Sequence, residues 1–292
     1  MSRTDRPLTA PTNADANVAI PEGDVAPSGS TRRRVTHRGR MEATYLSVVV
    51  PVWNGARQLP RTLFALHRLL SSLAYSSELI VVDDHSDTDT VDVLRQFEHA
   101  VERGSPHVRV FRNERNRGKG FSVQRGMLAA TGALRVFTDA DLAYPAEDIE
   151  AIVEALEHGN DVAVACRVLP GSRYVMSPSF FPYLFTRHLM SRAYNALVRG
   201  LLVPSVLDTQ AGLKGFTREA AERIFPRLTI ERFGFDVECL YIARRQGKRL
   251  VQVPVTFRYD DEPSTVRVLR DGARMFTDLG RIIVNARRGR YD

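Results

Sequence analysis

The stretch Glu78-Leu79-Ile80-Val81-Val82-Asp83-Asp84 decides the fold. Its continuous run of branched apolar residues predicts a strand that is buried on both faces, as in a parallel sheet covered by helices. Two carboxylates follow this strand at its carboxyl end, which is the edge where ligands bind in such sheets. The stretch therefore predicts an α/β architecture and the position of a site within it.

Similar apolar runs alternate with amphipathic segments on both sides of this stretch. This alternation predicts a mostly parallel sheet with helices on both faces. The later part of the chain has a different pattern, with a turn at 208–212, one or two further helices and a strand near 250–259. We expect strands at 46–52, 78–83, 108–112, 134–138 and 162–166, and helices at 59–73, 90–103, 118–131, 146–158 and 183–202, with a loop at 170–182 and a basic helix from Val268.

The composition indicates a soluble globular protein, with 43% hydrophobic and 26% charged residues among 292. Cys166 and Cys239 lie in apolar surroundings without the spacing of a disulfide or zinc site, which fits a reducing cytoplasm. The formal charge of +7 comes almost entirely from arginine. Because no helix-turn-helix, zinc or RNA-binding motif accompanies it, we weigh a nucleic-acid-binding protein only as the weakest hypothesis and expect no nucleic-acid partner.

Three segments follow from composition and charge. Residues 1–43 form a disordered basic tail, either without a function or as an electrostatic tether to acidic lipids. Residues 44–265 form the ordered main domain, and residues 266–292 a basic amphipathic helix. Arginine and large apolar residues gather between Asp161 and Asp208 and again near the C-terminus, which suggests a surface for an anionic amphiphile or the cytoplasmic face of a membrane. No apolar run is long enough to span a bilayer, and the N-terminus shows no signal peptide, so we expect a peripheral cytoplasmic location.

An acidic turn, Thr138-Asp139-Ala140-Asp141-Leu142, carries the most specific chemistry. Residues two apart at the end of a strand point to the same side, so Asp139 and Asp141 should converge. Converging carboxylates repel one another unless a cation lies between them, and oxygen ligands favour Mg²⁺ or Mn²⁺. Such an ion can neutralise a diphosphate leaving group. The alternative is that Asp141 caps the next helix, which leaves Asp139 unexplained.

Two further motifs indicate a nucleotide. Asp83 and Asp84 can accept hydrogen bonds from a base or ribose, although Asp84, Ser86 or Asp87 could instead cap the following helix. In the segment 116–120, Lys119 stands between two glycines before a helix, an arrangement that allows close approach to a diphosphate.

Downstream residues indicate an anionic acceptor. Arg167, Arg173 and Arg187 lie in a stretch without carboxylates and are suited to bidentate phosphate recognition. Asp208 with Gln210, and Asp236, lie among apolar residues, so we expect them to be buried with partners. Asp236 is either the cap of a helix or a residue that catalyses or orders the site.

In this order the motifs resemble family 2 glycosyltransferases, and within them the polyprenyl-phosphate glycosyl synthases. The resemblance covers about residues 45–280, and it implies a GT-A (Rossmann-like) fold, inversion at the sugar carbon, a nucleotide-sugar donor and a divalent metal. The segments that carry it are SVVVPVWN (47–54), VVDDHSD (81–87), NRGKG (116–120), TDADL (138–142), DTQAGLKGF (208–216) and GFDVE (234–238).

The resemblance also implies roles for individual residues. Asp83 and Asp84 would meet the nucleotide, with Pro51 and Asn54 lining the same pocket. Asp139 and Asp141 would match the metal motif. Arg167 and Arg187 would hold the acceptor phosphate beside a turn that contains Asp208 and Gln210.

The sequence departs from the family pattern at three places. His85 stands where the pattern has Gly, Ala143 where a Gln can complete the metal shell, and Ser264-Thr265 where a Ser-Lys pair is usual. The Asp-Thr-Gln turn at 208–210 is closer to the glucose synthases, which favours UDP-glucose as donor over GDP-mannose.

Two enzymatic hypotheses remain. In the first, a hexose passes from a nucleotide sugar to a polyprenyl phosphate, whose phosphate is largely ionised near neutral pH because its second pKa is about 6. Asp141 through the metal and Arg167 through the acceptor would then carry catalysis. In the second, a soluble family 2 enzyme acts on a hydroxyl of a glycan or small metabolite, with Asp208 or Asp236 as general base.

Overall fold

A seven-stranded sheet with the order β3-β2-β1-β4-β7-β5-β8 forms the centre of the protein. The computed structural model describes residues 43–101, 104, 106–176, 192–259 and 268–292, so most of the predicted tail lies outside it. The elements are β1 (Leu46–Val52), α1 (Leu59–Ser72), β2 (Ser77–Asp83), α2 (Thr88–Ala100), β3 (His107–Arg112), α3 (Lys119–Ala129), β4 (Leu134–Phe137), α4 (Asp148–Glu157), β5 (Val162–Cys166), β6 (Arg173–Met176), β7 (Lys214–Thr217), α6 (Arg218–Ile224), η2 (Phe225–Arg227), α7 (Phe235–Arg245), β8 (Leu250–Pro254), β9 (Thr256–Tyr259) and α8 (Val268–Arg287), with a further helix at 192–201.

The sheet is parallel except at β7. Strands β1, β2, β3 and β4 pair in parallel, as do β5 and β8, whereas β7 runs antiparallel between β4 and β5. The carboxyl ends of the parallel strands therefore meet at one edge. Because β7 runs the other way, its first residue, Lys214, lies at that same edge, and the turn 208–212 before it is brought there too.

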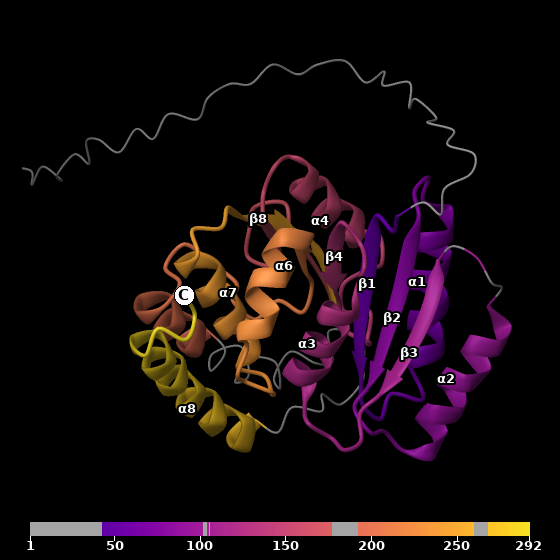
Figure 1. The fold of residues 1–292 in the computed structure, drawn as a ribbon, viewed down its shortest axis with the longest axis horizontal. Coiled ribbons are helices and arrows are strands. Elements are labelled where there is room, and N and C mark those ends of the chain that lie inside the picture. The colour runs from indigo at the N-terminus through magenta and orange to yellow at the C-terminus, as the bar shows by residue number, and fades with distance from the viewer. Residues whose placement is uncertain (1–42, 102–103, 105, 177–191, 260–267) are drawn as a thin grey trace, which may run out of the picture. The chain divides into compact units, whose positions relative to one another are not determined.

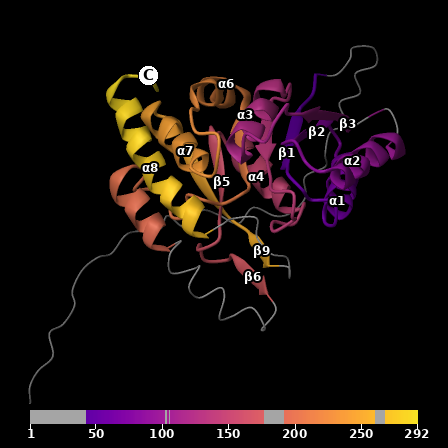
Figure 2. The same cartoon turned by 90° about the horizontal axis from the view of Figure 1, so that it is seen from below.

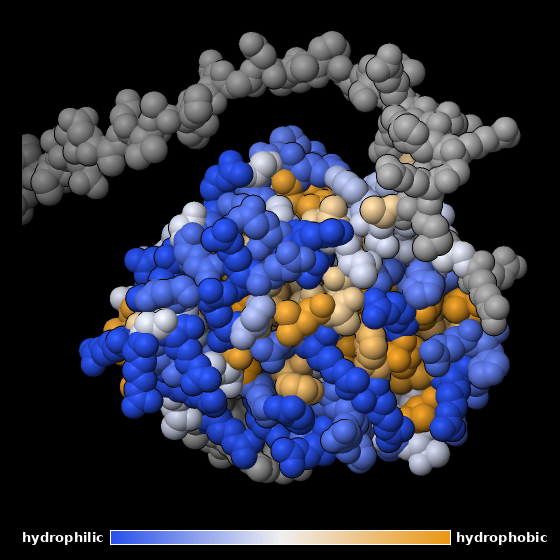
Figure 3. Space-filling view, in the orientation of Figure 1, coloured by the Kyte–Doolittle hydropathy of each residue, from blue (hydrophilic) through white to orange (hydrophobic). Residues whose placement is uncertain are grey.

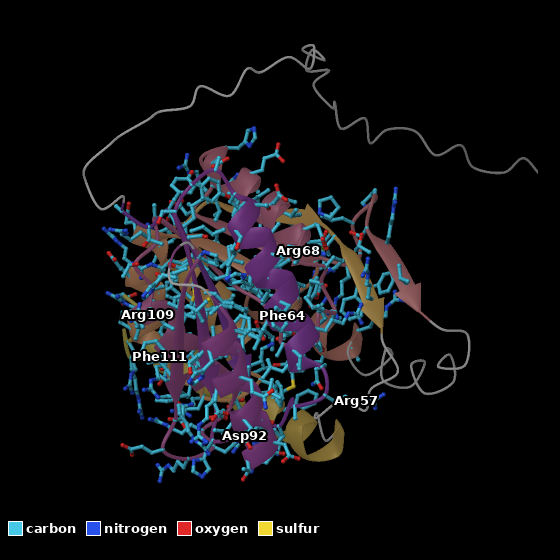
Figure 4. The ribbon with its side chains drawn as sticks, turned by 90° about the vertical axis from the view of Figure 1, so that its right-hand side faces the viewer. Arg57, Phe64, Arg68, Asp92, Arg109 and Phe111 are labelled. Atoms are coloured by element: carbon cyan, nitrogen blue, oxygen red, sulfur yellow. The ribbon has the colours of Figure 1, made fainter. Side chains whose placement is uncertain are left out.

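Helices cover both faces of this sheet, with α1 and α2 on one side and α3 on the other (Figures 1 and 2). The helix α1 buries Leu59, Leu63, Leu66 and Leu70, which recur at helical spacing. Its opposite side carries the half-exposed Phe64 (Figure 4). On the other face, a side chain at Gly126 of α3 would collide with Val49, so a glycine there permits close packing of the helix on β1.

The predicted α/β architecture is confirmed, and most elements begin and end within a few residues of their expected bounds. Three details differ from the prediction. The single strand expected near 250–259 is two strands, β8 and β9, which belong to different sheets. The segment 170–182, expected to be a loop, contains the strand β6, which pairs with β9. The short strand β7 was not expected, because its four residues contain a glycine and a lysine and so show no apolar run. The first half of the helix expected at 183–202 lies outside the described residues.

Candidate functional site

Strained backbone gathers at the carboxyl edge of the sheet. The non-glycine residues with positive φ in the described ranges are Asn54 (49°), His85 (62°) and Leu142 (53°), and each lies in a loop that follows β1, β2 or β4. A left-handed conformation costs an ordinary residue about 1–2 kcal/mol, and such costs tend to persist at functional sites. His85 thus adopts the left-handed turn that a glycine would adopt at this position.

Asp87, and not Asp83 or Asp84, caps the helix that follows β2. Its side chain accepts a hydrogen bond from the Thr90 amide at 3.0 Å. Asn54 joins this turn to the loop after β1. Its side-chain Oδ1 accepts a hydrogen bond from the Asp87 backbone amide at 2.9 Å, and its backbone amide donates to Ser86 Oγ at 2.9 Å. Of the three residues that the sequence offered as caps, Asp87 is therefore the one that caps the helix, and capping does not account for Asp83 or Asp84.

Asp84 orders the glycine loop before α3. Its buried carboxylate accepts hydrogen bonds from Asn113 Nδ2 (2.8 Å), the Arg117 amide (2.9 Å) and the Gly118 amide (2.6 Å). Sequence reasoning missed Asn113, which lies directly after β3 and could have been noticed as a polar residue at a strand end. Contact of Asp84 with the nucleotide stays a prediction. In the structure, Asp84 stabilises the loop that leads to Lys119.

Asp83 has one carboxylate oxygen that accepts no hydrogen bond in the structure. Its Oδ1 accepts from the Ser86 amide at 3.0 Å. Its Oδ2 is buried without a hydrogen bond, although Arg112 Nε approaches it to 3.4 Å as an ion pair of poor geometry. A buried acceptor left in this state costs free energy unless a ligand donates to it. Pro51, partly buried in β1, pairs with Val82 in the neighbouring strand.

Asp139 and Asp141 lie together, as the sequence predicts. Asp141 is exposed, yet desolvation by the surrounding atoms and the Asp139 charge raise the pKa of Asp141 to about 6. Thr62 of α1 stabilises the turn 138–142, because its hydroxyl donates a hydrogen bond to the Ala140 carbonyl at 2.6 Å. Asp141 accepts from the Ala143 amide at 3.0 Å, and α4 begins beyond Glu147, so Asp141 is not its cap.

The two carboxylates fit a hard divalent ion in part. Both offer oxygen, which Mg²⁺ and Mn²⁺ prefer, and their mutual repulsion favours a cation between them. Within the described ranges no cluster of three or more acidic, histidine or cysteine side chains forms here. The remaining ligands of an ion would therefore be water and donor phosphates. Mg²⁺ sites in proteins usually combine one or two carboxylates with such ligands.

Lys119, predicted to meet the donor diphosphate, forms an ion pair with Asp139 at 2.5 Å. Burial alone would lower the pKa of Lys119, but the charges of Asp139 and Asp236 raise it, so the ammonium is retained. On its other side Asp139 is packed against Gly212, where an added side chain would collide with Asp139 Oδ2. The motifs at 116–120, 138–142 and 208–212 therefore meet at one point.

Arg167 and Asp208 form a bidentate pair at the end of β5. The Arg167 Nε and Nη2 atoms donate to the two Asp208 oxygens at 2.7 and 2.9 Å, and the Arg167 amide adds a third bond at 3.1 Å. Burial would raise the pKa of Asp208, but the hydrogen bonds from Arg167 lower it below its ordinary value. The guanidinium also lies over the Phe257 ring at 5.1 Å. Both residues were predicted for the site, but not as partners of each other.

Asp236 is buried with a partner, as predicted, and that partner is Lys214. Lys214 Nζ lies 2.5 Å from Asp236 Oδ1 and also donates to the Ala211 carbonyl at 2.5 Å. The Lys214 side chain is fully buried. The capping alternative for Asp236 is wrong, because the cap position of α7 is Gly234. Lys214 was missed, although a lone lysine within Leu-Lys-Gly-Phe was a visible signal.

Glu238 orders the loop opposite the glycine segment. It accepts from the Thr229 amide and hydroxyl, the Ile230 amide and the Tyr291 hydroxyl, all between 2.6 and 2.9 Å. Side chains at Gly118 and Gly120 would collide with the carbonyls of residues in this loop. The C-terminal Tyr291 thereby supports the loop against which the segment 116–120 packs.

The remaining predicted acceptor residues are less well defined. Arg173 is exposed at the start of β6. Gln210 lies near Met275 of α8, with Nε2 4.0 Å from the sulfur. Arg187 lies outside the described residues. The structure thus places Arg167 at the edge of the central sheet, Gln210 in the turn before β7 and Arg173 in the separate two-stranded sheet.

The chain is similar in sequence to proteins of a known family. Residues 47–225 match the model of the family described as glycosyl transferase family 2. The dolichyl-phosphate beta-glucosyltransferase of Dictyostelium discoideum is 33% identical over 257 residues, which are 82% of this chain and 76% of that protein. The human protein of the same name is 37% identical over 68% of this chain, but the match covers only 63% of its own length.

A solved structure shares the fold. The crystal structure of glucosyl-3-phosphoglycerate synthase from Mycobacterium tuberculosis with UDP superposes with a TM-score of 0.60 at 20% identity, covering 82% of this chain and 80% of that one. Other structures of that synthase contain Mn²⁺ with UDP-glucose, or Mg²⁺ with UDP. At this identity the likeness concerns the fold alone.

Proposed function

The chain belongs to glycosyl transferase family 2, and from that premise we propose that it transfers glucose from UDP-glucose to the phosphate of a polyprenyl phosphate. The observation that carries the proposal is the state of the two carboxylates that a hydroxyl acceptor would need. Asp208 is held by Arg167 and Asp236 by Lys214, each in a short ion pair. A phosphate acceptor needs no base, because it is already largely ionised near neutral pH.

The named relatives support the acceptor. Several are dolichyl-phosphate beta-glucosyltransferases, and dolichyl phosphate is a polyprenyl-type phosphate. Arg167 supplies a guanidinium that is 23% exposed at the sheet edge and locked in orientation by Asp208. A preset guanidinium suits an anionic acceptor, since positioning accounts for a large part of such catalysis.

The donor is proposed on the same grounds. The relatives are glucosyltransferases, and the Asp-Thr-Gln turn lies against the acidic motif through Gly212. Asp83 Oδ2 offers a buried acceptor to the nucleotide, and Lys119 lies within reach of a diphosphate that would bind beside Asp139. Asp139 and Asp141 would hold Mg²⁺ or Mn²⁺, which when bound supplies Lewis-acid stabilisation of the leaving diphosphate.

A basic and apolar surface fits a membrane partner. The helix 192–201 and α8 lie against each other, with the Tyr194 and Phe276 rings 5.6 Å apart. Their solvent side exposes Leu197, Leu201, Phe276 and Val284, together with the exposed arginines 192, 281, 287 and 288. By contrast, Figure 3 shows mainly hydrophilic side chains over α6 and α7. None of the described helices meets the length and hydropathy needed to span a bilayer. We propose that this surface rests on an anionic leaflet, where apolar side chains enter the interface and arginines meet lipid phosphates.

Vesicle flotation tests the membrane surface. The protein should float with vesicles containing anionic lipid and should float much less when Leu201 and Phe276 are both replaced by Glu, because two charges then face the interface. A matched double change of the exposed Phe64 and Leu128 to Glu, remote from this surface, should float like the unmodified protein. Equal flotation of both variants would contradict the proposed surface.

The acceptor assay tests the function itself. The full chain is incubated with Mn²⁺ and radiolabelled UDP-glucose, with either a polyprenyl phosphate or the corresponding polyprenol. We expect label in the lipid fraction only with the phosphate, because the candidate bases are engaged in ion pairs. Transfer to the alcohol, or to a soluble sugar with equal efficiency, would favour a hydroxyl-directed glycosyltransferase. GDP-mannose in a parallel reaction tests the donor.

A further inference from the structure

Lys119 already contacts one of the two oxygens through which Asp139 could bind a metal ion. Its ammonium lies 2.5 Å from Asp139 Oδ1, while Asp139 Oδ2 is packed against Gly212. A metal ion that binds Asp139 through Oδ1 must therefore compete with the ammonium for that oxygen. A lysine ammonium and a divalent ion cannot occupy the same place on one carboxylate oxygen.

We propose that Lys119 is a built-in counter-cation of the metal site, which neutralises Asp139 in the absence of a divalent ion and competes with that ion for Asp139. This inference rests on the metal site of the proposed function. It adds that the lysine opposes binding of the ion alone, although the same lysine was expected to assist donor binding.

The surroundings make this exchange feasible. Lys119 is only 17% exposed, so its charge is largely shielded from water and its ion pair is stronger than one on the surface. It lies between two carboxylates, Asp139 and Asp236, and both act on its charge. When Asp139 turns to a metal ion, the ammonium can move toward Asp236 or toward the phosphates of a donor. Donor and metal would then assist each other's binding, as linkage requires when one ligand removes a competitor of the other.

Lys214 explains why Asp236 does not already hold Lys119. The Lys214 ammonium lies 2.5 Å from Asp236 Oδ1, so Asp236 is largely neutralised by its own buried partner. Asp139 has no comparable second cation among the interactions of the described residues. The resting position of Lys119 on Asp139 follows from this difference between the two carboxylates.

The test measures Mn²⁺ binding to the full chain without donor, by the electron paramagnetic resonance signal of free Mn²⁺. Lys119→Met should bind Mn²⁺ about tenfold more tightly, the effect expected for loss of a partly shielded competing charge. Lys119→Arg keeps the charge and should bind close to the unmodified protein. Lys248→Met is the matched control, since Lys248 pairs with Glu219 away from the site, and it should leave the affinity unchanged.

The outcomes separate this inference from the proposed function. Unchanged or weaker Mn²⁺ binding by a Lys119→Met protein that melts like the unmodified one would overturn the inference while the metal site stands. Tighter binding by Lys119→Arg as well would also overturn it, because the charge would then not be the competitor. If the unmodified protein and every variant bind no Mn²⁺, the metal site fails and the inference falls with it.

Discussion

Replacing Asp141 by Asn is expected to lower hexose transfer by about a thousandfold or more with the fold unchanged. Asp141 is exposed and contributes one local hydrogen bond, so its substitution leaves the core intact. Its carboxylate would share the metal with Asp139, and stabilisation of a leaving diphosphate by a metal is worth several kcal/mol. About 4 kcal/mol corresponds to a rate factor of roughly a thousand.

The measurement compares turnover and Mn²⁺ affinity of this variant with those of Glu150→Gln. Glu150 is an exposed acidic residue in the first turn of α4, and no role in the site is assigned to it. The control should retain full turnover, while Asp141→Asn should lose both Mn²⁺ binding and transfer. Turnover near that of the unmodified enzyme in Asp141→Asn would remove the metal role assigned to this turn.

Replacing Lys214 by Met is expected to destabilise the protein by about 3–5 kcal/mol, because it leaves Asp236 as an unpaired buried charge. Lys214 is fully buried, and Asp236 is 6% exposed. The pair lies where β7 meets α7, so the loss also affects the position of the residues beside Asp139. Denaturant unfolding of the full chain measures the change in the free energy of unfolding.

Two further variants isolate the charge from the volume. Lys248→Met makes the same substitution in an ion pair whose partner is exposed, and it should change stability by less than about 1 kcal/mol. Combining Lys214→Met with Asp236→Asn removes both charges and should recover much of the loss, since the coupling of buried partners is not additive. A double variant as unstable as the sum of its parts would show that packing, and not the ion pair, accounts for the effect.

The sheet and its active edge follow from local patterns in the sequence. Apolar runs such as Leu79–Val82 fixed strand positions, and the carboxylates after them marked the edge where ligands bind. Asp139 and Asp141 were predictable as a pair because residues two apart at a strand end share a side. These inferences use only neighbours along the chain, which is why they agree with the structure.

The pairings within the site could not be predicted in the same way. Arg167 and Asp208 are 41 residues apart and Lys214 and Asp236 are 22 apart, so their contacts depend on how the strands are ordered. The key unforeseen element is β7, whose antiparallel insertion brings Asp208, Gly212 and Lys214 to the edge where the parallel strands end. Because the sequence did not predict that strand, Asp208 and Asp236 were considered as possible general bases. In the structure, Asp208 pairs with Arg167 and Asp236 pairs with Lys214.

The most direct test of the account is the chemical linkage in the product formed from UDP-glucose and a polyprenyl phosphate. Nuclear magnetic resonance of the purified lipid should show coupling between phosphorus and the anomeric carbon of glucose, with the anomeric configuration inverted from that of the donor. That result would place the sugar on the acceptor phosphate, as the occupied carboxylates Asp208 and Asp236 lead us to expect. A product without this coupling, in which glucose is joined to a hydroxyl oxygen, would contradict the account.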